Sequence, residues 1–150
     1  MSSLYVREQI KTFFASISTE KLVDISDEYS EVFDMVSAAG VGENEDWVGI
    51  QFLGGEELPV SLTANNSLGK YREFGSIYIH IVAVAKLGGL DDILQRAETL
   101  RDAFRGQRIN NITVDAVSPP NTGTGAALSF EGGYTAAVFT IDYRNEKNLP

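Results

Sequence analysis

The feature that most constrains the fold is the alternating stretch from Ser76 to Lys86, which is typical of one long strand. Successive side chains of a strand point to opposite faces of a sheet, so every second residue shares a face. The two faces here carry Ile77, Ile79, Ile81 and Ala83, and Tyr78, His80, Val82 and Val84. Because both faces are largely apolar toward the end of the stretch, we expect this strand at the centre of a sheet.

Four shorter strands are predicted elsewhere in the chain. They span residues 47–53, 58–63, 111–118 and 134–144. In the last of them Ala137, Phe139, Ile141 and Tyr143 alternate along the chain, as expected for a strand with one buried face. Pro59 has no N–H group to donate, so it predicts that the second of them lies at a sheet edge or that a strand starts there.

Three helices are predicted, over residues 3–16, 27–38 and 90–105. In the first, apolar residues recur with helical spacing from Val6 to Ile17, and Ser2 or Ser3 is a suitable N-cap. The second is expected to start after Ser26 and to stop at Gly40, and the third to stop at Gly106.

The order of these elements predicts the fold class. Strands outnumber helices, and the first three strands follow one another by turns, so the sheet should be mostly antiparallel. Helices on one face of such a sheet define an α+β fold, here of about five strands in a single domain spanning residues 1–150. Residues 1–46 are expected to be an acidic helical segment, 47–144 the sheet and its helix, and 145–150 a loose tail.

The charge of the chain is unevenly distributed. The chain has 12 Lys and Arg residues and 21 Asp and Glu residues, which gives a net charge of −9. Nine of those acids, Glu31 and Asp34 among them, lie between Ser18 and Asp46 beside the single base Lys21, which gives this segment −8. It is either a solvated helix and loop or an acidic wall that repels a partner. Because an acidic surface repels phosphates, a sequence-reading nucleic-acid binder is disfavoured.

Residues suited to catalysis or metal binding are scarce. The chain has no Cys and one His, so neither a thiolate nucleophile nor a Cys-ligated metal is available, and an enzyme is disfavoured. His80 is expected to be a half-buried strand residue with one hydrogen bond. Asp91 and Asp92 point about 100° apart on a helix, so they complement its dipole rather than converge on a ligand. Residues 123–127 (Gly-Thr-Gly-Ala-Ala) lack the strand before and the helix after that a dinucleotide loop needs. No cofactor and no metal are expected.

The third helix and the residues just beyond it are rich in arginine. Arg96, Arg101, Arg105 and Arg108 lie near Glu98 and Asp102. This mixture is either an exposed face of alternating sign or a basic patch that meets the acidic segment of another copy.

Several segments together resemble the tail terminator (tail completion) proteins of long-tailed, non-contractile phages. Trp47 to Phe52 is similar to the family's first sheet strand, and Leu58 to Leu62 to its Pro-then-Ser-Leu segment. Tyr71-Arg72-Glu73-Phe74-Gly75 is similar to its Arg-x-x-Gly entry to an apolar strand. Residues 90–104 match its amphipathic helix, and 134–144 its closing strand. The segment 18–46 is longer and more acidic than the family leads us to expect.

The resemblance implies a structural virion protein rather than an enzyme. Such proteins form a ring, expected here as a hexamer, that caps the tail tube at its head-proximal end and joins it to the neck. The implied partners are further copies of the chain, the tail-tube protein and a head-side connector protein, with DNA passing through unbound and no membrane involved. The protein would be made in the host cytoplasm. The alternatives are a neck or head-completion protein and a small-ligand-binding α+β domain.

The residues expected to form interfaces fall in three places. The polar loops 64–74 and 121–133 are the expected docking elements, because long loops of this kind often carry function. The Arg-rich helix and the acidic segment supply charge of opposite sign. The candidates are Leu68, Tyr71, Arg72, Thr122, Thr124, Leu128, Phe130, Arg101, Arg105, Glu31 and Asp34.

Overall fold

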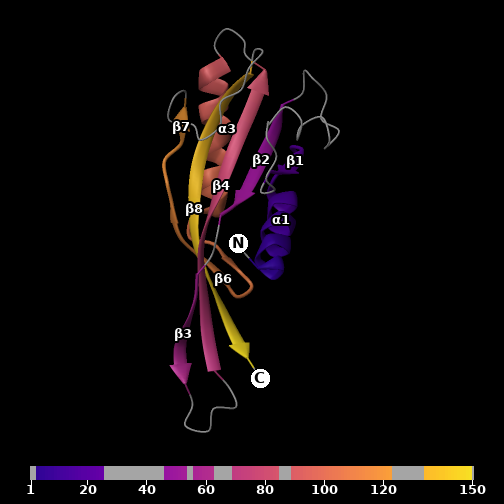
Figure 1. Ribbon diagram of the computed structural model, residues 1–150. Coiled ribbons are helices and arrows are strands. Elements are labelled where there is room, and N and C mark those ends of the chain that lie inside the picture. Colours follow the sequence, from indigo (N-terminus) through magenta and orange to yellow (C-terminus); the bar gives the residue numbers. More distant parts are fainter. Residues whose placement is uncertain are drawn as a thin grey trace.

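A computed structural model describes residues 3–25, 46–53, 56–62, 69–84, 89–122 and 134–149. In these ranges two helices accompany one sheet (Figure 1). The elements in chain order are α1 (Leu4–Ile17), β1 (Leu22–Asp24), β2 (Trp47–Phe52), β3 (Glu56–Leu62), β4 (Gly69–Val84), α3 (Gly89–Phe104), β5 (Arg108–Ile109), β6 (Ile112–Val117), β7 (Asn121–Thr122) and β8 (Tyr134–Leu149).

The sheet is built around β4 and β8, which pair antiparallel along their whole lengths of 16 residues. Six strands follow the order β1-β2-β4-β8-β6-β5, while β3 pairs with β4 and β7 with β8. Every pairing is antiparallel except that of β1 with β2. The expected α+β fold with a mostly antiparallel sheet is therefore confirmed, and the expected long central strand is β4.

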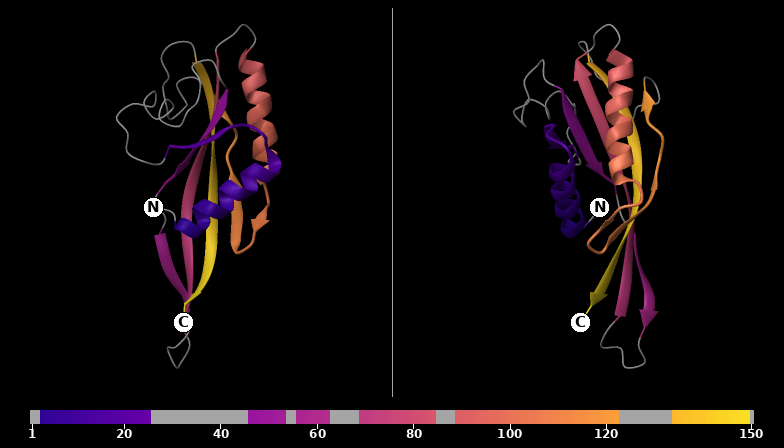
Figure 2. Two further views of the ribbon diagram at one scale, coloured as in Figure 1. Left: turned by 90° about the vertical axis from the view of Figure 1, so that its right-hand side faces the viewer. Right: turned by 180° about the vertical axis from the view of Figure 1, so that it is seen from behind.

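Both helices cover the same face of the sheet, as expected (Figure 2). The stripe of α1 is buried at Val6, Ile10 and Phe14, and α1 meets α3 where the rings of Phe13 and Phe104 lie 5.1 Å apart. Under the helices lie alternate residues of the three central strands, namely Val48, Ile50, Phe52, Ile77, Ile79, Ile81, Ala83, Ala137, Phe139, Ile141 and Tyr143. The hydrophobic effect thus selects one face of each strand for the core.

The predicted helix ends are largely confirmed. Ser3 is the N-cap of α1, where its hydroxyl oxygen accepts a hydrogen bond from the Val6 N–H at 3.4 Å. Gly106 follows the end of α3 with φ of +70°, a conformation that glycine adopts without the steric cost of a Cβ. Asp91 and Asp92 lie in the first turn of α3, where acids complement the helix dipole.

Two predicted irregular segments are strand instead. The loop expected over residues 64–74 is wrong for 69–74, which begin β4, and the loose tail expected at 145–150 is wrong for 145–149, which end β8. These residues are mostly polar, yet their backbones pair with each other, and β3 pairs with β4 on its other side. A distant partner strand satisfies backbone groups whatever the local composition is.

β3, the first residues of β4 and the last residues of β8 pair to form a three-stranded ribbon. It projects beyond the helices at one end of the molecule (Figures 1 and 2). β3 pairs only with β4 in the described part of the chain, so the edge position that Pro59 predicted is confirmed. We call the level at which the ribbon leaves the body the ribbon root; it contains residues 72–75 of β4 and 143–146 of β8.

Part of the acidic segment forms strand β1 of the sheet, which the sequence pattern did not predict. β1 pairs parallel with β2, so that Val23 lies beside Gly49. The two-residue strands β5 and β7 were also missed, because so short a segment has no readable period. The helix expected over 27–38 lies outside the described residues.

Candidate interaction surfaces

The structure describes the side chains of three predicted interface residues, Arg72, Arg101 and Arg105. Tyr71 lies in β4 and Thr122 in β7, where only the backbone is described. The others lie outside the described residues; they are Leu68, Thr124, Leu128, Phe130, Glu31 and Asp34. The three arginines do not form one patch, because Arg72 belongs to the ribbon root whereas Arg101 and Arg105 belong to α3 and its end.

Arg101 has a structural role within the chain. Its guanidinium donates to the carbonyl oxygens of Ser118 at 2.8 Å and of Val117 at 3.2 Å. Ser118 is bonded in turn to β8, since its N–H donates to the Thr140 carbonyl and its hydroxyl accepts from the Thr140 N–H. Arg101 therefore ties α3 to the chain just before Pro119, and replacing it would disturb the fold as well as any interface.

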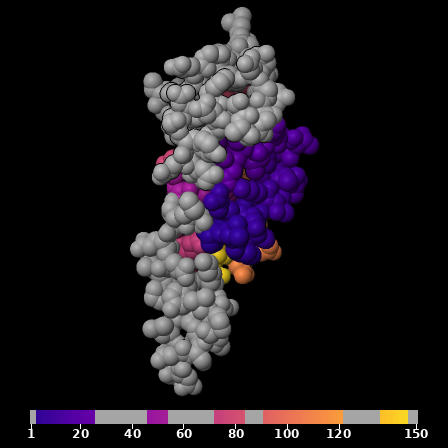
Figure 3. Space-filling view, turned by 45° about the vertical axis from the view of Figure 1, so that its right-hand side comes forward, coloured from indigo at the N-terminus to yellow at the C-terminus, as the bar shows by residue number. Residues whose placement is uncertain are grey.

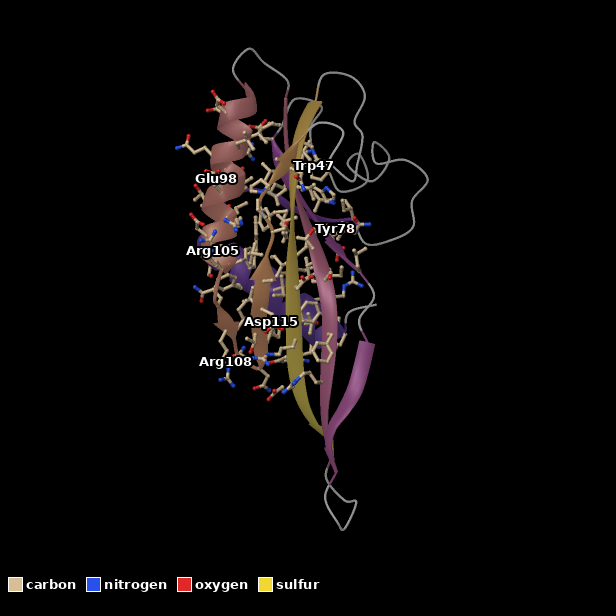
Figure 4. All side chains as sticks on the ribbon, turned by 90° about the vertical axis from the view of Figure 1, so that its left-hand side faces the viewer. Trp47, Tyr78, Glu98, Arg105, Arg108 and Asp115 are labelled. Atoms are coloured by element: carbon tan, nitrogen blue, oxygen red, sulfur yellow. The ribbon has the colours of Figure 1, made fainter. Side chains whose placement is uncertain are left out.

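Arg105 is the more accessible arginine. Its side chain is 56% exposed and its nearest carboxylate is that of Asp102 at 3.5 Å, an exposed pair that contributes little to stability. Figure 4 shows Glu98, Arg105 and Arg108 on the outer side of α3 and β5. This surface has the alternating sign that the sequence pattern favoured.

Arg96 has partners that its position in the sequence did not reveal. It pairs with Glu20 and lies 3.7 Å from a carboxylate oxygen of Asp46. These two residues are the first and last acids of segment 18–46, which carries most of the negative charge. A single guanidinium on α3 therefore holds both ends of that segment close together. The basic helix and the acidic segment thus meet within one chain at this point.

At the ribbon root, a buried carboxylate joins α1 to the sheet. Glu73 is 4% exposed and accepts a hydrogen bond from the Tyr143 hydroxyl at 2.6 Å and one from the Ser3 N–H at 3.4 Å. Hydrogen bonds of this kind offset the cost of burying the charge. Asn145, opposite Glu73 in the register, is 1% exposed, and its side-chain amide has no hydrogen-bond partner among the described residues.

The position of the Tyr143 side chain explains why the Arg-x-x-Gly segment has a glycine, Gly75. A Cβ at Gly75 would lie 2.5 Å from the Tyr143 hydroxyl oxygen and 2.7 Å from the ring carbon that bears it. Such a contact is sterically forbidden, so only glycine lets the Tyr143 ring lie across β4 and reach Glu73. The arginine of the same segment, Arg72, pairs across the strands with Glu146 at 2.6 Å.

His80 lies on the sheet face opposite the helices, the same side on which Figure 4 shows Trp47 and Tyr78. It is fully buried rather than half-buried as expected. One ring nitrogen, Nε2, lies 3.4 Å from the Gln51 side-chain oxygen, and Nδ1 has no partner among the described residues. Burial lowers the pKa of His80 from 6.5 to about 4, so the imidazole is neutral at pH 7.

Large apolar side chains are exposed at three described positions, Leu4, Tyr5 and Phe74. Their exposed fractions are 70%, 38% and 36%. Among the residues that the structure describes, no cluster of three potential ligands could hold a metal ion, and neither of the described helices is long and apolar enough to cross a membrane.

Comparison with models of known protein families and with characterised proteins found no match to this chain.

Proposed function

We propose that the protein is a tail terminator, a structural virion protein that caps the tail tube of a long-tailed phage as a ring. Its partners in this role are further copies of itself, the tail-tube protein and a head-side connector. The ring stops tube growth and provides the surface to which the neck binds.

The observation that carries the proposal is where the family-like segments fall in the fold. Residues 47–52 are β2, 58–62 lie in β3, 71–75 lie in β4, 90–104 lie in α3 and 134–144 lie in β8. These elements form one sheet with its covering helix. Five short likenesses scattered along a chain are weak evidence singly, but here they fall on elements that form one structural unit.

The glycine and tyrosine of these segments are also coupled in space. Gly75 belongs to the Arg-x-x-Gly segment and Tyr143 to the closing strand, and the Tyr143 ring occupies the space that a Cβ at residue 75 would fill. Two separate likenesses therefore describe one packing arrangement, which supports reading them as parts of the same family pattern.

The charge distribution suits a ring through which DNA passes. Arg96 pairs with Glu20 and lies 3.7 Å from Asp46, so the first and last acids of segment 18–46 lie close together. With a charge of −8 on each subunit, this segment would give a ring a negative zone that does not retain phosphates.

Electron microscopy of tails tests the proposal. In phage that lack this protein, tail tubes should grow to uncontrolled lengths, and adding the purified protein to polymerising tube protein should end growth. A matched control adds an equal amount of an unrelated acidic protein. Tubes of normal length that fail to join heads would contradict termination and indicate the neck role instead.

A further inference from the structure

The exposed apolar side chains lie at one level of the molecule. Leu4 and Tyr5 form the start of α1, which the Ser3 N–H joins to Glu73, and Phe74 is the next residue of β4. In Figure 3 the indigo surface of α1 borders the surfaces of β4 and β8 at this level. Among the side chains that the structure describes, the exposed large apolar ones therefore lie at the ribbon root or beside it.

Leu4 and Tyr5 lie on the helix side of the sheet, whereas Phe74 lies on the other side. Glu73 points to the helix side, where it meets Tyr143 and Ser3, so Phe74 points to the other side by strand alternation. We call the two areas the front patch, with Leu4, Tyr5 and Glu8, and the back patch, with Phe74, Arg72 and Arg144.

The two patches have complementary chemistry. In the front patch, Glu8 is exposed and lies one helical turn from both Leu4 and Tyr5. In the back patch, the Arg72 guanidinium lies 5.9 Å from the centre of the Phe74 ring, and Arg144 is the cross-strand neighbour of Phe74. Each patch thus combines an aromatic ring with charged groups, a carboxylate on the front patch and two guanidinium groups, each paired with one acid, on the back patch.

The back-patch arginines retain donors for a further partner. Arg72 uses one terminal nitrogen on Glu146. Arg144 lies 3.2 Å from Asp115 through its Nε, with its side chain 39% exposed. Since a guanidinium has five N–H donors, the remaining terminal N–H groups of both arginines can donate to a further carboxylate.

We infer that the front patch of one copy binds the back patch of the next, with Glu8 facing Arg72 and Arg144 and with Leu4 and Tyr5 against Phe74. A contact between different patches on opposite faces is heterologous, so it repeats from copy to copy and closes into a ring when the rotation allows. The inference rests on the proposed function, for which it supplies the subunit contact.

The occupant is a second copy because both halves of the contact are present on each chain. Copies with a net charge of −9 repel one another at long range, and this repulsion is screened by salt.

Two variants, each damaged in one patch, test the contact. The front variant carries Leu4→Gln and Tyr5→Gln, and the back variant carries Phe74→Thr, which replaces one residue of high strand propensity with another. Ala15→Gln, on the exposed side of the same helix at its other end, is the matched control. Circular dichroism and thermal unfolding first establish that all three retain the fold.

Sedimentation velocity and native mass spectrometry then measure the oligomers. Wild type and the control should associate progressively with concentration, whereas each patch variant alone should associate at least about tenfold more weakly. A mixture of the two patch variants should form dimers and nothing larger, because the intact front of one fits the intact back of the other.

Three results would overturn the inference. They are a wild type that stays monomeric up to about 1 mM, patch variants that associate like wild type, and a mixture of patch variants that stays monomeric. None of these measurements involves tails, so a chain that terminates tubes but fails here would leave the proposed function standing and the subunit contact wrong.

Discussion

Protonation of His80 should make the stability of this protein depend on pH. Burial lowers the pKa of His80 to about 4, against 6.5 when the chain is unfolded. Between these values the unfolded chain binds a proton that the folded chain does not, so the free energy of unfolding falls as the pH falls from 6.5 toward 4. The stabilising difference is fully present above pH 6.5.

The magnitude follows from the size of the pKa difference. One pKa unit corresponds to about 1.4 kcal/mol, so a fall from pH 7 to pH 4 should remove about 3 kcal/mol through this single group. That is a large part of the stability of an ordinary domain. Carboxylates titrate over part of the same range, and therefore the comparison needs a variant that differs only at His80.

His80→Leu is that variant, since it keeps the site apolar and removes the titrating group. Urea unfolding at several pH values should show the stability of wild type falling by about 3 kcal/mol more than that of the variant between pH 7 and pH 4. His80 is the only histidine, so its imidazole proton signals in an NMR titration are unambiguous. Parallel stability profiles, or an NMR midpoint near 6.5, would refute the reasoning.

Three other substitutions test the packing at the ribbon root and at α3. Gly75→Ala should lower the free energy of unfolding by about 1–3 kcal/mol in urea titrations, because the new Cβ collides with Tyr143. Tyr143→Phe should cost about 1–3 kcal/mol by removing a hydrogen bond to the buried Glu73 carboxylate, and a loss near zero would show that this bond is unimportant. Arg101→Ala should speed amide hydrogen exchange near the end of β6, where its guanidinium holds two carbonyl groups; unchanged exchange would contradict that role.

Local periodicity was sufficient to predict the elements that carry the core. The spacing of Val6, Ile10 and Phe14 identified α1, and the alternation around Ile79 identified the central part of β4 as a long strand. These predictions succeed because burial of a regular element depends on the period of its own apolar residues. The ends of β4 and β8 were predicted poorly, because residues 69–74 and 145–149 are mostly polar and become strand by pairing with distant strands.

In the candidate interfaces, too, the sequence identified individual residues but not their distant partners. The sequence identified Arg101 and Arg72 as notable, but it did not predict that one binds carbonyl groups near Ser118 or that the other lies against Phe74. The pairing of Arg96 with both ends of the acidic segment was not predictable from spacing either. Partners this far apart in the chain are brought together only by the complete fold.

The sequence by itself determined the fold class and the acidic nature of one segment, because each depends on residues close together in the chain. Tertiary structure alone decided that polar residues extend β4 and β8 into a ribbon, and that Glu73, Tyr143 and Gly75 meet at its root. The physical reason is that backbone hydrogen bonds and close packing between distant strands do not depend on local pattern.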